Sequence, residues 1–306
     1  MTKPKGDSTC SSGSFSLAAL SVYKDTGILL RKATIMTLPA TLTYKAVQYH
    51  RASEPLFVGS ETLTFDRKGD DYIVKPSQIL VKIKAAALNP IDLVLKGLSG
   101  PLINFLTTGT HGIARDYAGV VEAIGDEAAK STGLKNGDRV CGLVGRVLYQ
   151  GTFAEYFLYD TKLELDLVKI PDSLSYEDAA AFPLVVSTAL NIVELAKVNK
   201  NLRVVVIGAL TSVGRAAIQI ARKVYGVEFV VGVCSTTSAK EVQALGAQVL
   251  DYLQHDLILK PTQELAKDSL FDAIIDCVGN GDYMKDITSV LKKKGEYVTI
   301  VGDSIL

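Results

Sequence analysis

The residues with the clearest chemical pattern are small ones that follow an apolar run. Residues 203–208 read Arg-Val-Val-Val-Ile-Gly, and residues 209–214 continue as Ala-Leu-Thr-Ser-Val-Gly. A tight turn of small residues between a strand and a helix lets the backbone approach a pyrophosphate, while the amides at the helix N-terminus hold the phosphates. The pattern therefore predicts a nucleotide-phosphate site, although any parallel α/β protein can show a similar turn.

This turn keeps only part of the glycine pattern GxGxxG. Counted back from Gly214, the first two glycine positions hold Ala209 and Thr211. Ala209 is a mild change, but Thr211 puts a β-branched side chain where a pyrophosphate would come closest. We expect the cofactor to contact this turn at Gly208, Ala209, Thr211, Ser212, Val213 and Gly214.

The turn after the second apolar run carries hydroxyls and no acid. Residues 234–240 read Cys-Ser-Thr-Thr-Ser-Ala-Lys, where NAD-binding enzymes usually place an Asp or Glu on the ribose hydroxyl. Ser235 and Lys240 suit a 2′-phosphate instead, so the expected cofactor is NADPH. The alternative is a Ser/Thr-rich turn that caps the next helix, with Lys240 on its solvated face.

Strands and helices alternate from Pro171 to the end of the chain. Ser175 is the expected N-cap of the first helix, because acids follow in its first turn. Five strands separated by helices predict an α/β fold with a doubly wound, Rossmann-type parallel sheet. The expected strands are 203–208, 229–234, 248–252, 271–279 and 296–302, and the expected helices are 212–223, 240–246 and 285–294.

The preceding part of the chain is rich in short β-type runs between turn residues, at 44–49, 79–88, 117–125 and 138–144. We therefore expect three segments. Residues 1–40 form a Ser/Thr-rich, disordered extension, residues 41–170 form a β-rich domain, and residues 171–306 form the dinucleotide-binding domain.

Composition excludes several classes of protein. The 306 residues carry 33 basic and 33 acidic side chains, so the chain lacks the positive charge of a general nucleic-acid binder. No run is long and apolar enough to span a bilayer. The four cysteines are too widely spaced for a zinc knuckle and indicate a reduced, cytoplasmic protein; a mitochondrial presequence is the less favoured interpretation of the N-terminal 40 residues.

Several motifs occur in the order and spacing of one known family. They are Ala-Ala-Ala-Leu-Asn-Pro-Ile-Asp-Leu at 85–93, Asp-Tyr-Ala-Gly-Val-Val at 116–121, Gly-Thr-Phe-Ala-Glu-Tyr at 151–156, Pro-Leu-x-x-x-Thr-Ala at 183–189, Leu-Gly-Ala at 245–247 and Asp-Cys-Val-Gly at 276–279. With the glycine turn, they resemble the medium-chain dehydrogenase/reductase superfamily. The zinc-independent quinone oxidoreductase branch is most similar, especially yeast proteins of the Ast and Yim type, which are relatives of reticulon-interacting oxidoreductases.

The resemblance implies a fold and a reaction. The β-rich domain would be GroES-like, and the chain would reduce a quinone or an α,β-unsaturated carbonyl with NADPH. Zinc alcohol dehydrogenases place a ligand Cys and a ligand His where this chain has Asn89 and Arg115, so no metal is expected. The three histidines, His50, His111 and His255, are scattered.

Individual site residues also follow from the resemblance. Asn89 would be catalytic, facing the nicotinamide and donating a hydrogen bond to the substrate oxygen; alternatively, it caps the preceding strand in an Asn-Pro turn. Asp92 would cap the short helix that follows. Thr188 would approach the nicotinamide ribose, and the remaining cofactor contacts would come from Tyr252, Val278 and Gly279.

Two observations favour a different class of function. Family members continue well beyond the last predicted strand, so the sheet is expected to be truncated at its edge here, and Thr211 departs from the glycine pattern. The alternative is a non-catalytic, Ast-like scaffold in protein trafficking, associated peripherally with a membrane or a membrane protein. The resemblance also implies a homodimer, and the substrate itself stays open.

Overall fold

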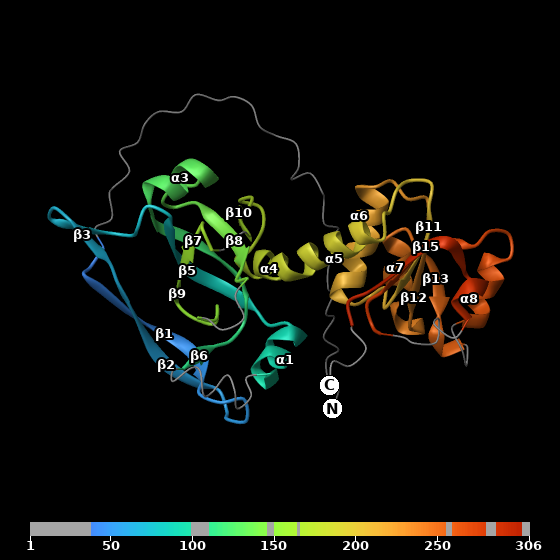
Figure 1. The fold of residues 1–306 in the computed structure, drawn as a ribbon, viewed down its shortest axis with the longest axis horizontal. Coiled ribbons are helices and arrows are strands. Elements are labelled where there is room, and N and C mark those ends of the chain that lie inside the picture. Colours follow the sequence, from blue (N-terminus) through green and yellow to red (C-terminus); the bar gives the residue numbers. More distant parts are fainter. Residues whose placement is uncertain are drawn as a thin grey trace, which may run out of the picture. The chain divides into compact units, whose positions relative to one another are not determined.

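The computed structural model describes residues 38–98, 110–145, 150–163, 166–254, 259–279 and 286–301 (Figure 1). Most of the predicted N-terminal extension, residues 1–37 with Cys10, therefore lies outside the described residues, as does His255. The other three cysteines, at 141, 234 and 277, are buried free thiols. Among the helices of the described ranges, none is long and apolar enough to cross a membrane.

The first part of the described chain is rich in β-strands, as predicted, and these strands are antiparallel. One sheet has the order β2-β1-β6 and another has the order β10-β8-β7-β5-β9; β3 and β4 form a separate hairpin. The bounds are β1 Thr41–Tyr49, β2 Phe57–Thr64, β3 Asp66–Lys68, β4 Asp71–Ile73, β5 Gln78–Ala87, β6 His111–Gly112, β7 Asp116–Ile124, β8 Arg139–Leu143, β9 Tyr156–Asp160 and β10 Asp166–Lys169, with helices α1 Pro90–Leu98 and α3 Asp126–Thr132.

The core of the five-stranded sheet comes from residues of alternate positions that face the same side. Ile79 and Val81 of β5 lie beside Val121 of β7, and Tyr117 and Phe157 pack with ring centroids 5.3 Å apart. All five are at most 1% exposed. Leu80, between Ile79 and Val81, is fully buried as well and belongs to a second apolar cluster with Val74 and Ala123. β5 is therefore buried on both faces here, as its unbroken apolar run at 79–81 requires.

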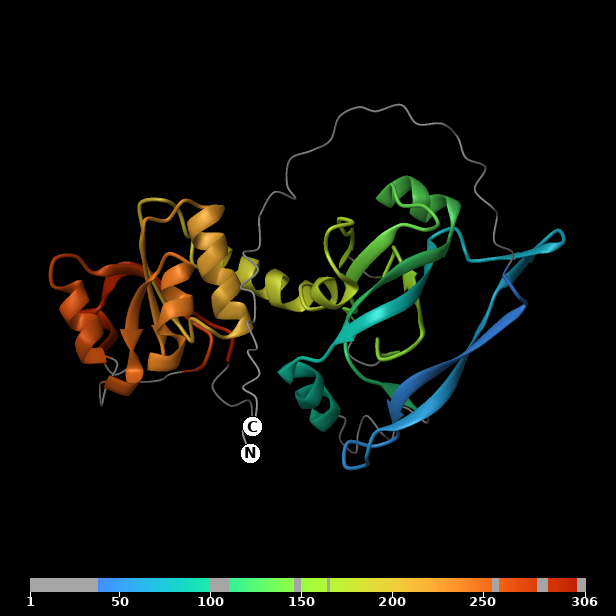
Figure 2. The same cartoon turned by 180° about the vertical axis from the view of Figure 1, so that it is seen from behind.

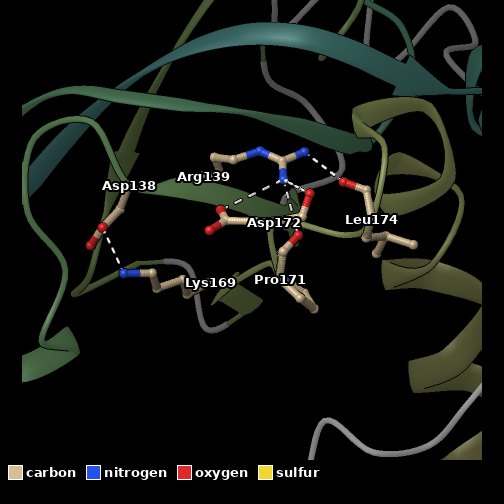
Figure 3. Close-up of polar contacts among 6 residues, drawn as sticks. All are labelled: Asp138, Arg139, Lys169, Pro171, Asp172 and Leu174. Carbon is tan, nitrogen blue, oxygen red and sulfur yellow. Dashed lines mark hydrogen bonds and ion pairs between the residues drawn. The ribbon is translucent and has the colours of Figure 1, made fainter. Parts of the chain in front are cut away.

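The chain then enters two helices, α4 (Tyr176–Ala180) and α5 (Pro183–Leu195). Ser175 caps α4 as predicted, because its hydroxyl accepts a hydrogen bond from the Asp178 amide at 3.0 Å. Arg139 of β8 fixes the segment before the cap: its guanidinium donates to the carbonyls of Pro171, Asp172 and Leu174 (Figure 3). The neighbouring Asp138 points instead toward Lys169 of β10 (Figure 3).

The last part of the chain is the predicted parallel α/β sheet, with strand order β13-β12-β11-β14-β15. Helices α5, α6 and α7 contribute to one apolar layer and α8 to the layer on the opposite face (Figures 1 and 2). The bounds are β11 Arg203–Ile207, α6 Ser212–Lys223, β12 Phe229–Cys234, η2 Thr236–Ser238, α7 Ala239–Ala244, β13 Gln248–Asp251, η3 Tyr252–Gln254, α8 Leu259–Ala266, β14 Phe271–Asp276 and β15 Leu291–Thr299.

The predicted helix at 285–294 is wrong where the structure describes it. Residues 286–289 form a short 3-10 turn, and β15 already begins at Leu291, which pairs with Phe271 of β14. Leu291 is buried in the apolar layer, and Lys292 lies beside Asp272, with a separation of 2.7 Å between the charged atoms. Strand pairing therefore overrides the helix preference of the lysine run.

Candidate functional site

The glycine turn joins β11 to α6 and requires two residues without side chains. Gly208 has a φ of +73°, which is unfavourable for a residue with a Cβ, and a Cβ there would lie 2.4 Å from Val278 Cγ2. A Cβ on Gly214 would lie 2.2 Å from the Gly208 carbonyl oxygen. The first turn of α6 therefore passes directly over the end of β11, which is the close backbone approach that the sequence pattern predicted.

Thr211 is the N-cap of α6. Its hydroxyl accepts a hydrogen bond from the Gly214 amide at 3.0 Å and donates one to the Gly208 carbonyl at 2.8 Å. The residue that departs from the glycine pattern thus stabilises the turn from within, and Thr is among the residue types preferred at helix N-caps. The amides of Ser212 and Val213 have no acceptor within the helix, because they belong to its first turn.

A cavity of about 340 Å³ opens at the carboxyl ends of the parallel strands. Its lining includes five residues predicted from the sequence, which come from four different strand ends: Gly208, Thr211, Ser235, Tyr252 and Val278. The crevice at the carboxyl ends of the strands is where ligands bind in open α/β sheets. The lining also includes residues that the sequence reasoning missed, namely Ile207, Leu210, Val233, Cys234 and Ser238.

Other predicted cofactor residues lie outside this lining. Ala209 is fully buried beneath the turn, with its amide bonded to the Val233 carbonyl at 2.9 Å. Lys240 is exposed on α7, Thr188 is partly buried on α5, and Gly279 follows β14 with a φ of +83°. None of these four residues lines the cavity, and neither do the predicted residues of the first turn of α6, 212–214.

The turn after β12 gathers three hydroxyls. Ser235 Oγ lies 3.0 Å from Thr237 Oγ1 and 3.0 Å from Ser238 Oγ. The fold also brings an acid to this turn, because Thr236 donates to Asp251 at the end of β13. The local sequence shows no acid within residues 234–240, and only the pairing of β12 with β13 reveals Asp251 there.

Asn89 is the residue before α1, and two carboxyl groups contact it. Its side-chain Nδ2 donates to Asp116 Oδ2 at 2.8 Å, and its backbone amide donates to Asp92 Oδ2 at 2.7 Å. Asp92 thus caps the start of α1 as predicted. The Asn89 side chain bonds across to β7 rather than capping the strand that precedes it, so its amide is held at a tertiary contact.

Asp116 is the centre of this arrangement and has no role in the sequence prediction. It is fully buried, and its Oδ1 accepts a hydrogen bond from the Leu184 amide at 2.9 Å. Burial raises the pKa of Asp116 to about 6, although the hydrogen bonds from Asn89 and Leu184 act to lower it. Burial also raises the pKa of Asp92. An acid directly before the apolar run at 117–121 is the sequence signal that could have identified Asp116.

The donor set at the expected zinc positions does not suit zinc. The Asn89 amide nitrogen is bonded to Asp116, and the Arg115 guanidinium donates to the carbonyls of Val144 and Gly145, both at 2.8 Å. An amide and a guanidinium cannot replace thiolate and imidazole ligands. Among the described residues, no group of three or more His, Cys, Asp or Glu side chains could hold a metal ion.

Comparison with known proteins identifies the family. Residues 75–172 match the alcohol dehydrogenase GroES-like domain, and residues 212–303 match the family described as zinc-binding dehydrogenase. Protein YIM1-2 of Lachancea thermotolerans is 33% identical over 280 residues, which cover 86% of this chain and 74% of the relative. Protein YIM1 of Saccharomyces cerevisiae is 30% identical over 281 residues, with the same coverage of each chain.

Solved structures agree with these relatives. The quinone oxidoreductase from Coxiella burnetii superposes with a TM-score of 0.66 at 27% identity. The superposed region covers 84% of this chain and 75% of the Coxiella chain. A Pseudomonas syringae quinone oxidoreductase gives a TM-score of 0.61, also at 27% identity, over 84% of this chain and 73% of its own. The chain therefore belongs to the medium-chain dehydrogenase/reductase superfamily of oxidoreductases, in the quinone-oxidoreductase-like branch that resembles the yeast Yim1 proteins.

Proposed function

We propose that this protein is an NADPH-dependent, zinc-independent reductase that passes a hydride to a quinone or an α,β-unsaturated carbonyl. The observation that carries the proposal is the 340 Å³ cavity at the carboxyl ends of β11, β12, β13 and β14, next to the glycine turn. Family membership supports an oxidoreductase with a nicotinamide cofactor. The identity of the cofactor and of the substrate is our proposal.

The residues around the turn fit a dinucleotide. Gly208 and Gly214 let the start of α6 pack directly against the end of β11. The Ser212 and Val213 amides belong to the N-terminus of this helix, which favours phosphate. Apolar lining from Ile207, Val233 and Val278 suits the flat faces of the cofactor rings. When bound, NADPH supplies the hydride, and the reduction is completed by a proton from solvent.

The turn after β12 favours NADPH over NADH. Ser235 and Ser238 place hydroxyls at the cavity, and Lys240 lies two residues further along the chain, at the start of α7. The carboxyl group of Asp251 already accepts hydrogen bonds from Thr236 and from the Leu253 amide, at 2.9 Å for the amide. A 2′-phosphate can therefore bond to hydroxyls and to one lysine.

The substrate oxygen would be polarised by hydrogen bonds rather than by a metal. Asn89 is the proposed donor, because its amide is anchored to Asp116 through one N–H and keeps its second N–H for a substrate. The donors at positions 89 and 115 do not suit zinc. Zinc-free activity is thus part of the proposal, and a chelator should leave it unchanged.

Titration with NADPH and NADH tests the cofactor assignment. We expect NADPH to bind at least tenfold more tightly, a ratio that corresponds to about 1.4 kcal/mol and that one lysine and two hydroxyls can supply. Lys240→Ala should lower the ratio. Lys130→Ala removes the same charge from the exposed end of α3 and should leave it unchanged. Equal affinities in the wild type, or an unchanged ratio in Lys240→Ala, would refute the assignment.

Activity assays separate the enzyme from the alternative function. With NADPH bound, the wild type should reduce a simple benzoquinone or an enone. Elemental analysis of protein prepared without a metal-binding tag should find no stoichiometric zinc. If the folded protein binds neither nucleotide, the non-catalytic scaffold becomes the better account.

A further inference from the structure

A single buried carboxyl group connects three elements of the fold. Asp116, at the start of β7, is 0% exposed. Its Oδ2 accepts a hydrogen bond from the Asn89 side chain before α1, and its Oδ1 accepts one from the Leu184 amide in the first turn of α5. The two donors come from positions 27 and 68 residues away in the sequence. Each oxygen of the carboxylate therefore holds a different segment.

No cation compensates this carboxyl group by direct contact within the described ranges. Arg115, the adjacent residue, directs Nε and Nη2 to the carbonyls of Val144 and Gly145. Its charge nevertheless acts to lower the pKa of Asp116. The other titratable groups around Asp116 are Asp92 and Cys141; burial, and then the Asp116 charge, raises the pKa of Cys141 to about 11. Burying an acid among such neighbours is costly, so packing alone does not explain its presence.

The chemistry of the carboxylate fixes the orientation of the Asn89 amide. An ionised carboxylate only accepts hydrogen bonds, so Asn89 must turn its NH₂ group toward Asp116 and its Oδ1 away. The backbone of Asn89 is fixed as well, because Asp92 Oδ2 accepts from the Asn89 amide and the Asn89 carbonyl accepts from the Asp92 amide at 3.0 Å. Only Oδ1 and the second N–H of the side chain are left to meet a ligand.

The same carboxylate completes the start of α5. Phe182 is the N-cap residue of this helix and provides no side-chain hydrogen bond, so Asp116 supplies the missing acceptor from another element. The helix dipole favours a negative charge at this end. Thr188, the proposed contact to the cofactor ribose, lies on the same helix.

We propose that Asp116 is a positioning residue of the reductase site, which acts by holding the Asn89 amide in the donating orientation. This inference rests on the proposed function. Asp116 is fully buried and does not touch the substrate, so its contribution is made through Asn89. Its removal should lower the rate of reduction much more than it weakens NADPH binding, because a misplaced donor affects the reacting oxygen.

A double-mutant cycle on Asp116 and Asn89 tests the proposal. The substituted amide in Asp116→Asn can accept from only one of the two donors, so this variant should lower kcat about tenfold or more, as should Asn89→Ala. The double variant should be no slower than Asn89→Ala alone, since both changes remove the same donor. If the two losses multiply, or if KM for NADPH changes while kcat does not, Asp116 is not a positioning residue for Asn89.

Thr152→Val is the matched control. Thr152 is fully buried, and its hydroxyl donates to the backbone carbonyl of Asp116 at 2.8 Å. Losing this hydrogen bond should destabilise the fold to an extent similar to Asp116→Asn, but it leaves the carboxylate in contact with Asn89. We expect kcat to be unchanged. A loss of kcat equal to that of Asp116→Asn would mean that general destabilisation explains the effect.

A measurement on the wild type covers the case in which Asp116→Asn does not fold. The Asn89 side-chain signals are identified by their loss in Asn89→Ala, and the amide proton bonded to Asp116 should exchange with solvent much more slowly than the amide protons of an exposed asparagine. Free exchange would overturn the proposal. A wild type that binds no cofactor and reduces no quinone would refute the proposed function instead, and the exchange measurement would still decide whether Asp116 holds the amide.

Discussion

Gly214 offers the sharpest test of the close approach between α6 and β11. In Gly214→Ala, the new Cβ would lie 2.2 Å from the Gly208 carbonyl oxygen and 3.1 Å from Thr211 Oγ1. Ordinary contacts to a Cβ begin at 3.4 Å, so the helix start must move by about 1 Å. The obstacle is backbone, which cannot rotate away as a flexible side chain can.

The expected cost combines three effects. Overpacking against backbone lowers the free energy of unfolding by about 3 kcal/mol, and disturbance of the Thr211 cap lowers it by about 1 kcal/mol more. The better helix propensity of Ala raises it by about 1 kcal/mol. The free energy of unfolding should therefore fall by about 3 kcal/mol, and NADPH affinity should fall at least tenfold because the Ser212 and Val213 amides shift with the helix.

Urea denaturation followed by circular dichroism measures this change, and Gly97→Ala is the control. Gly97 lies on α1, and a Cβ there would meet no atom within 4 Å. The same substitution should thus raise stability by about 0.5–1 kcal/mol through helix propensity alone. If Gly214→Ala is as stable as the wild type and binds NADPH equally well, the close approach is not what positions the turn.

Three further predictions concern single side chains. Thr211→Ala removes the cap of α6 and should lower the free energy of unfolding by about 1 kcal/mol, whereas Thr211→Gly should cost only a few tenths; equal losses in urea titrations would argue against capping. Arg139→Met keeps the side-chain stem but loses the bonds to three carbonyls and should lower the free energy of unfolding by about 2 kcal/mol (Figure 3). Lys169→Met should cost less than about 1 kcal/mol, because the Lys169 side chain is more exposed and Asp138 keeps its bond from the Lys135 amide; similar values for the two variants would contradict the role of Arg139. Burial raises the pKa of Asp116 from 3.8 to about 6, so the folded state binds this proton more tightly than the unfolded chain does. The group therefore contributes about 3 kcal/mol to the free energy of unfolding below about pH 4, and this contribution is lost as the pH rises to about 6. Asp116→Asn should remove the resulting decrease in the free energy of unfolding between about pH 4 and 7, and an unchanged pH dependence would refute the assignment.

Local patterns predict the elements of this fold well. The apolar run of β11 and the small residues that follow it predict α6 with the bounds that the structure shows, Ser212–Lys223. The predicted helix at 285–294 fails because the pairing of Leu291 with Phe271 is a long-range contact that a run of lysines does not reveal. Periodicity captures what neighbours in sequence determine, and strand pairing decides the rest.

In the candidate site, too, the residues close together in sequence were predicted and the long-range contacts were not. Gly208, Thr211 and Gly214 were found because the whole turn lies within seven residues of the chain. The contacts of Asp116 with Asn89 and Leu184, and that of Asp251 with Thr236, join positions that only the folded sheets bring together. The charges that tune the site are therefore the part that sequence reasoning missed.

Calorimetric titration of the folded wild type with NADPH tests the central claim most directly. The cavity at the ends of β11, β12, β13 and β14, with the turn that begins at Gly208, predicts saturable binding of one NADPH per chain. A protein shown to be folded by circular dichroism that gives no binding heat at several temperatures, and whose melting temperature is not raised by NADPH, would contradict the claim.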